Sequence, residues 1–162
     1  MRQALVLSCA LAAVACARGV PAAGAAAATA AADSLRGTIE VVGSEPATSV
    51  ALLMDGGARA VTLVGERPLL DRLAGLEVAV WGSLLRPGVF RVDRVAVRAA
   101  SGVAAVDGVL AREGAGWVLV TVDGRRMAIP RLPEALRGMA GARVWIAGPL
   151  DHPDSFGVIR DP

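Results

Sequence analysis

The chain has 162 residues, of which 54% are hydrophobic, and its 17 basic and 15 acidic residues give a net charge of +2. This composition excludes an intrinsically disordered protein, and the length suits one ordinary domain or two very small ones. The balanced charge gives no ground for a nucleic-acid or membrane-surface partner. All 17 basic residues are arginine, tyrosine and asparagine are absent, and His152 is the only histidine. The side chains that most enzymes use in catalysis are therefore scarce.

The first 15 residues have the organisation of an export signal. Arg2 gives a positive start, and residues 4–15 form an apolar run that matches a signal-peptide core and is too short to span a membrane as a helix. Residues 11–16 read Leu-Ala-Ala-Val-Ala-Cys, which resembles the bacterial lipobox, where small residues precede a cysteine that becomes lipid-modified. The resemblance implies that residues 1–15 are removed and that Cys16 carries a lipid anchor.

The alternative is ordinary secretion, because Ala13-Val14-Ala15 also satisfies a signal-peptidase site and Cys16 would then have no role. Since alanine rather than aspartate follows Cys16, resemblance to Gram-negative lipoproteins implies the outer membrane, facing the periplasm. No cysteine occurs after position 16, so the mature chain holds no internal disulfide. Residues 16–33 are rich in alanine without an amphipathic pattern, and we expect them to form a tether.

The remainder of the chain contains an internal duplication. Its two units are residues 34–100 and 101–162, each too short to bury much surface alone. The same short motifs occur in both units in the same order. Gly37 corresponds to Gly108, Asp55-Gly56 to Asp123-Gly124, Leu73-Ala74-Gly75 to Met139-Ala140-Gly141, Val78–Gly82 to Val144–Gly148, and Phe90 to Phe156.

Hydrophobic alternation and turn residues predict three strands, a short helix and two more strands in each unit. Proline opens each predicted helix and glycine ends it. In the first unit the strands are expected at 35–42, 48–55, 58–64, 76–84 and 88–97, with the helix at about 67–74. In the second they are expected at 105–112, 116–123, 125–129, 142–150 and 155–160, with the helix at about 132–140.

This order resembles that of the OB-fold, a five-stranded barrel with its helix between the third and fourth strands. The chain is thus similar to bacterial envelope proteins with OB-like domains, and the resemblance implies a mainly β protein of two tandem barrels. A single β-sandwich and one larger barrel shared by both units are the alternatives. Val78, Val80, Val144 and Ile146 are expected in the core.

The fourth predicted strand of each unit contains a tryptophan, but when the two units are aligned the tryptophans differ in position by two residues. Trp81 aligns with Ala147, and Trp145 aligns with Ala79, so the bulky side chain changes place on one strand face while the total volume is kept. This favours packing in a core or between the units. The alternative is an aromatic stacking surface, for which Trp81, Trp145, Arg91 and Arg125 are the candidate ligand-binding residues.

The only imidazole lies in a loop with several polar neighbours. His152 and Ser155 could form a hydrolytic pair, but no oxyanion hole or nucleophile elbow accompanies them. Asp151, His152 and Asp154 could bind a divalent cation, yet the matching loop of the first unit, residues 85–88, contains no such ligands. We therefore expect a solvated hairpin loop, no catalytic residues, no bound metal and no cofactor.

These observations predict a non-enzymatic envelope module that is attached to the membrane only through its lipid anchor. It would bind an envelope protein or glycan through the barrel loops, or serve as a structural tandem. A metal or hydrolytic site near His152 is the first alternative function. Binding of an oligosaccharide or single-stranded nucleic acid on the barrel face is the second, although nucleic acid is not expected because acidic residues are interspersed among the arginines.

Overall fold

A computed structural model describes residues 33–44 and 46–162. The predicted signal peptide, Cys16 and the tether up to residue 32 lie outside the described residues. The protein is mainly β, and its described residues form ten strands that pair almost entirely antiparallel, which confirms the expected fold class at this level. The described residues form one compact unit. Among the described residues, no helix is long and apolar enough to cross a membrane.

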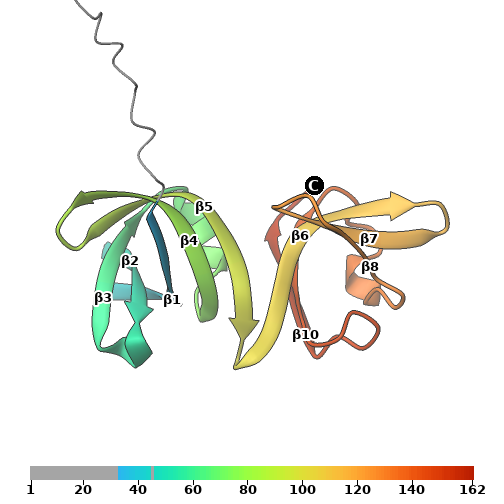
Figure 1. Ribbon diagram of the computed structural model, residues 1–162, viewed down its shortest axis with the longest axis horizontal. Coiled ribbons are helices and arrows are strands. Elements are labelled where there is room, and N and C mark those ends of the chain that lie inside the picture. The colour runs from blue at the N-terminus through green and yellow to red at the C-terminus, as the bar shows by residue number, and fades with distance from the viewer. Residues whose placement is uncertain (1–32, 45) are drawn as a thin grey trace, which may run out of the picture. The chain divides into compact units, whose positions relative to one another are not determined.

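The first half consists of five strands and one short helix (Figure 1). Strand β1 pairs with β2 and β4, β2 pairs with β3, β3 pairs with β5 in parallel, and β5 pairs with β4. The pairings therefore return to their starting strand and leave no edge of this sheet open. Its elements are β1 (Asp33–Ser44), β2 (Ala47–Met54), the 3-10 turn η1 (Asp55–Gly57), β3 (Arg59–Val64), α1 (Arg67–Arg72), β4 (Leu76–Arg86) and β5 (Val89–Ala100).

The second half repeats the order of strands but not the closed pairing. Its strands follow the spatial order β10-β9-β6-β7-β8, and within the described residues no pairing joins β8 to β10. Strand β8 has three residues, and Pro130, shortly after it, has no N–H with which to continue a ladder. The elements are β6 (Val103–Glu113), β7 (Gly116–Thr121), β8 (Arg126–Ala128), the 3-10 turn η2 (Glu134–Leu136), β9 (Arg143–Ala147) and β10 (Ser155–Arg160).

Two predicted elements of the second half are wrong in type or length. The helix expected at 132–140 is the three-residue turn η2, because Pro133 is extended and Gly138 follows two residues after the turn, leaving too few residues for a stable helix. The strand expected at 142–150 ends at Ala147. There Gly148 adopts a φ of 85°, which turns the chain, and Pro149 lacks an N–H.

The duplication extends to the backbone contacts of the two halves. The N–H of Gly75 donates to the carbonyl of Ile39 at 2.8 Å, and the N–H of Gly141 donates to the carbonyl of Leu110 at the same distance. A glycine two residues before each of these carbonyl groups lies directly against a neighbouring strand. A Cβ at Gly37 would overlap the carbonyl oxygen of Leu53, and one at Gly108 would overlap that of Val120.

The two halves share part of their hydrophobic core. Val78, Val80, Val144 and Ile146 are each fully buried, which confirms their predicted core positions. One cluster fills the second half alone. The other fills the first half and also includes Ala105, Ala147 and Ile159 from the second. Ion pairs Arg72–Asp161 and Glu66–Arg160 lie at the same junction, between α1 and the end of β10.

Candidate functional site

The connection between the halves is a tight turn followed by diverging strands (Figure 1). Ser101 and Gly102 both have positive φ, 49° and 78°, as in the turns that suit two-residue β-hairpins. Strands β5 and β6 pair only beside this turn, at Ala99 with Ala104 and Ala100 with Val103. Beyond these residues the strands separate, and the polar backbone atoms of β5 on that side need other partners.

A buried ion pair supplies those partners. The carboxylate of Asp107 on β6 accepts hydrogen bonds from the N–H of Val97 and from Nε of Arg143, each at 2.8 Å. Arg143 on β9 also donates to the carbonyl of Val95 at 2.6 Å. Asp107 is 4% exposed. Asp107 therefore links the two halves from the interior of β6.

A groove of about 220 Å³ lies where β5 and β6 diverge. It is bounded by both halves: β4 and β5 form one wall, and β6 with the β7–β8 turn forms the other. Two of the four predicted ligand-binding residues, Trp81 and Arg125, meet here although they are 44 positions apart in the sequence. The lining residues are Trp81, Arg94, Ala96, Val97, Arg98, Val106, Asp107, Thr121, Val122, Asp123 and Arg125. We call this the Trp81 groove.

Two arginines of β5 cover the indole ring of Trp81. The guanidinium carbon of Arg94 lies 4.2 Å from the ring centroid, and that of Arg98 lies 5.7 Å from it. Arg94 is directly opposite Trp81 in the β4–β5 ladder, and Arg98 is four residues later, at a β-bulge between Val97 and Ala99. Within the described residues, neither guanidinium forms an ion pair with an acidic side chain.

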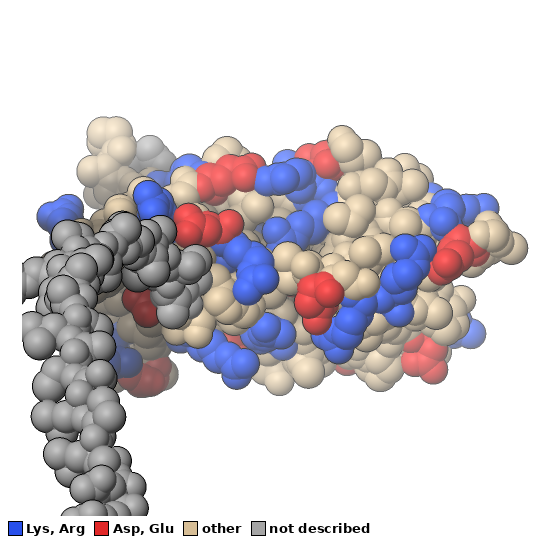
Figure 2. Space-filling view, turned by 45° about the horizontal axis from the view of Figure 1, so that its top comes forward, with Lys and Arg blue, Asp and Glu red and all other residues tan. Residues whose placement is uncertain are grey.

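The opposite wall carries a short polar network. The hydroxyl of Thr121 donates to the carboxylate of Asp123, which also pairs with Nε of Arg125 at 2.9 Å. The Thr121 hydrogen bond is the main cause that lowers the pKa of Asp123, and the positive charge of Arg125 adds to it. Asp123 therefore stays ionised to lower pH than an ordinary aspartate. Arginine side chains gather across the visible face in Figure 2, with acidic side chains among them.

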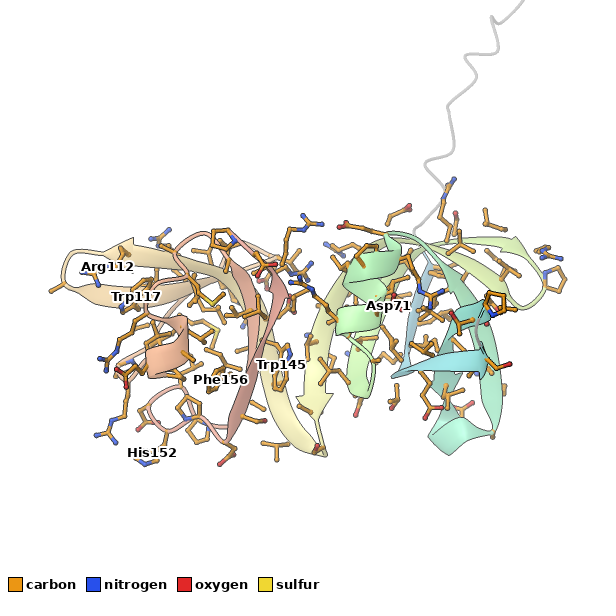
Figure 3. The ribbon with its side chains drawn as sticks, turned by 180° about the vertical axis from the view of Figure 1, so that it is seen from behind. Asp71, Arg112, Trp117, Trp145, His152 and Phe156 are labelled. Atoms are coloured by element: carbon orange, nitrogen blue, oxygen red, sulfur yellow. The ribbon has the colours of Figure 1, made fainter. Side chains whose placement is uncertain are left out.

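The other two predicted ligand-binding residues lie outside the groove. Trp145 faces the first half from β9 (Figure 3) and packs against the shared core. Gly157, its partner on β10, makes room for the indole, since a Cβ there would lie 2.6 Å from its ring nitrogen. Trp145 thus packs between the units. Arg91 is exposed, donates to the hydroxyl of Ser83 at 3.2 Å and lies 3.6 Å from Asp93.

His152 is exposed at the end of the β9–β10 loop and is remote from the labelled tryptophans (Figure 3). The backbone N–H of His152 donates to the carbonyl of Pro149. In the part of the chain that the structure describes, no group of three or more histidine, cysteine, aspartate or glutamate side chains is arranged to hold a metal ion. Asp151 and Asp154 therefore do not join His152 in such a cluster.

A larger hollow, of about 630 Å³, lies on the first half beside the β2–β3 turn. Glu40, Glu77 and Asp55 line it with Arg36, and Asp55 is paired with Arg59 outside it. It contains no aromatic side chain, and its glycines are Gly37 of β1 and Gly56 and Gly57 of the turn. The Trp81 groove is the better candidate because it combines an aromatic ring with arginines that are not engaged by acids.

Arg94 and Arg98 were not among the site residues predicted from the sequence. The pattern that identifies them is a pair of arginines four apart on one strand, the first of them opposite a tryptophan on the neighbouring strand. Comparison with known proteins adds no relative: no family model, curated protein or solved structure matches this chain. The geometry of the groove is therefore the basis for a functional proposal.

Proposed function

We propose that this protein is a non-enzymatic binding module of the cell envelope, anchored through lipidated Cys16, and that the Trp81 groove is its binding surface. We also propose that both halves are OB-like units. The closed pairing of the first half, with α1 in the chain between β3 and β4, supports this assignment because it follows the OB order. The second half keeps the strand order, and its short β8 accounts for the missing pairing.

One observation carries the binding proposal: Arg94 and Arg98 are held on Trp81 inside a groove without an acidic partner. Some exposed arginines of the described chain pair with an acid, as in Arg59–Asp55, and Arg112 lies over a single tryptophan, but only at Trp81 do two such guanidiniums share one ring. Two neighbouring guanidiniums repel each other, and a tryptophan that is only partly buried leaves apolar surface in water. A ligand that covers both would relieve these unfavourable features.

The decisive experiment blocks the groove without changing its charge. Val122 lines the groove and is 48% exposed, so Val122→Trp fills the space from the surface. The mature protein and this variant serve as bait in envelope extract, with captured proteins and glycans identified by mass spectrometry. We expect a specific ligand on the wild type and its loss on the variant. The same ligand on both proteins, or none on either, would contradict the proposal.

A matched control tests steric specificity. Val109 is 41% exposed and does not line the groove, so Val109→Trp adds the same bulk elsewhere and should leave capture unchanged. Stoichiometric copurified metal, or hydrolase activity that is lost in His152→Ala, would contradict a non-enzymatic function.

The anchor has its own test. Intact-mass analysis of protein purified from the membrane fraction should find a chain that begins at Cys16 and carries added acyl mass. A mature chain that begins elsewhere and has no acyl mass would refute the anchor while leaving the groove proposal standing.

A further inference from the structure

The Trp81 groove also indicates what kind of ligand it takes, an inference that rests on the proposed function. Its positive charge is not neutralised from within. Asp107 is occupied by Arg143 and by the N–H of Val97, and Asp123 is occupied by Thr121 and Arg125. Arg94 and Arg98 are left to meet a negative group from outside.

The stacking arrangement prepares these guanidiniums for a carboxylate. A guanidinium lying over an aromatic face is held by cation–π attraction and by ring contact, which restricts the long arginine side chain before a ligand arrives. Arg94, at 4.2 Å from the ring centroid, is in this position. Arginine presents its N–H groups as a planar fork that fits the two oxygens of a carboxylate. The indole therefore supports the arginines, and the ligand meets their N–H groups.

The opposite wall distinguishes an acidic sugar from a polyanion. The hydroxyl of Thr121 and the carboxylate of Asp123 present hydrogen-bond acceptors across the groove from the arginines. Sugar hydroxyls can donate to such acceptors, whereas a chain of phosphates carries no donor for them. The volume of about 220 Å³ is below the ~300 Å³ at which pockets for drug-sized ligands begin, and it suits one sugar ring.

We propose that the Trp81 groove binds a carboxylate-bearing sugar ring of an acidic glycan, with Arg94 and Arg98 holding the carboxylate and the Thr121–Asp123 wall accepting hydrogen bonds from the ring hydroxyls. Both halves of the protein then contact the same ring. The ligand stabilises the arrangement of β5 and β6 that the Asp107–Arg143 pair already holds.

Titration calorimetry on the mature protein in detergent tests this assignment. The probe is tetragalacturonate, and galactotetraose supplies similar rings without carboxylates. We expect the neutral sugar to bind at least about tenfold more weakly, because it loses the charge-assisted hydrogen bonds between its carboxylate counterpart and the guanidiniums. Equal affinity for both sugars, no measurable binding of tetragalacturonate, or tighter binding of a single-stranded oligonucleotide would overturn the assignment.

Matched variants separate specific recognition from general charge. Arg94→Gln/Arg98→Gln should weaken tetragalacturonate binding by about tenfold or more. The control Arg86→Gln/Arg137→Gln removes the same charge from exposed arginines outside the groove and should change affinity by less than about twofold. Equal losses in the two double variants would refute the assignment. Arg94→Lys keeps the charge without the planar fork, so binding as tight as in the wild type would also refute it.

The failure of this inference is distinguishable from that of the proposed function. If Val122→Trp abolishes capture of an envelope ligand while Arg94→Gln/Arg98→Gln leaves that capture intact, the groove binds something other than an acidic sugar. If Val122→Trp has no effect on capture, the groove is not the binding surface. Urea midpoints of every variant establish that it is folded.

Discussion

The buried Asp107–Arg143 pair is expected to be a major contributor to the stability of this protein. We consider Asp107→Ala, which removes the carboxylate that accepts hydrogen bonds from the N–H of Val97 and from the guanidinium of Arg143. The side chain of Asp107 is 2% exposed and that of Arg143 is 20% exposed. Both donors would therefore lose their partner in a place that water reaches poorly.

The magnitude follows from this burial. Removing one partner of a buried ion pair costs about 3–5 kcal/mol, and the partial exposure of Arg143 places the expected loss near the lower end, at about 3 kcal/mol. Asp107→Asn keeps an oxygen that can accept from Val97 but loses the charge that faces Arg143. Its expected loss is about 1–2 kcal/mol, the difference between charged and neutral hydrogen bonds.

Urea unfolding followed by circular dichroism measures these losses as changes in midpoint at constant slope. Arg143→Met, alone and combined with Asp107→Ala, completes a double-mutant cycle. We expect the combined loss to fall below the sum of the single losses by about 1–3 kcal/mol, since each single change already breaks the pair. A loss of less than about 1 kcal/mol for Asp107→Ala, or simple additivity in the cycle, would refute the reasoning.

The remaining predictions concern the duplicated glycines and the acidic turn. Gly37→Ala should lower the free energy of unfolding by about 2 kcal/mol or more, because the new methyl group overlaps a backbone carbonyl. Gly138 has open space around it, so Gly138→Ala should change the free energy of unfolding by less than about 0.5 kcal/mol. Equal urea midpoints for the two variants would contradict this prediction. Gly157→Val should destabilise the wild type by about 1–3 kcal/mol and have little effect in a Trp145→Ala background, and an undiminished loss there would show that the indole is not what Gly157 accommodates. Asp123 has a pKa lowered from 3.8, so the stability that it contributes is present above about pH 3.8 and is lost as pH falls through the lower folded value. NMR titration should find this depressed pKa, and acid unfolding of Asp123→Asn should lack that part of the pH dependence.

Much of the local structure could be predicted because its causes lie within a few residues. Alternating apolar residues located most strands, and Pro68 and Gly75 framed the region of α1. The same reasoning failed at 132–140, where an equivalent proline and glycine enclose a 3-10 turn. Gly138 within this interval weakens the helix, and the pattern of apolar residues alone does not reveal that loss.

The candidate site was predictable only in part. Trp81 and Arg125 were identified by residue type, but nothing in their local sequence indicates that they share a groove. Arg94 gains its importance from the β4–β5 register, which places it across from the indole, and Arg98 gains its importance from a β-bulge in the same strand pair, from which its guanidinium reaches the same ring. Trp145, chemically equivalent to Trp81, instead packs between the halves because Gly157 leaves room for it.

The sequence by itself determined the mainly β class, the duplication and the four central core positions, because alternation and repeated glycines act through nearest neighbours along the chain. Only the tertiary structure decided that the first half pairs into a closed cycle while the second stays open, since this depends on whether β3 and β5, or β8 and β10, meet across a long separation. Only the tertiary structure also shows that Asp107 links the two halves. A carboxylate acquires partners such as Val97 and Arg143 from strands that come together in space, and their positions are set by the packing of the whole unit.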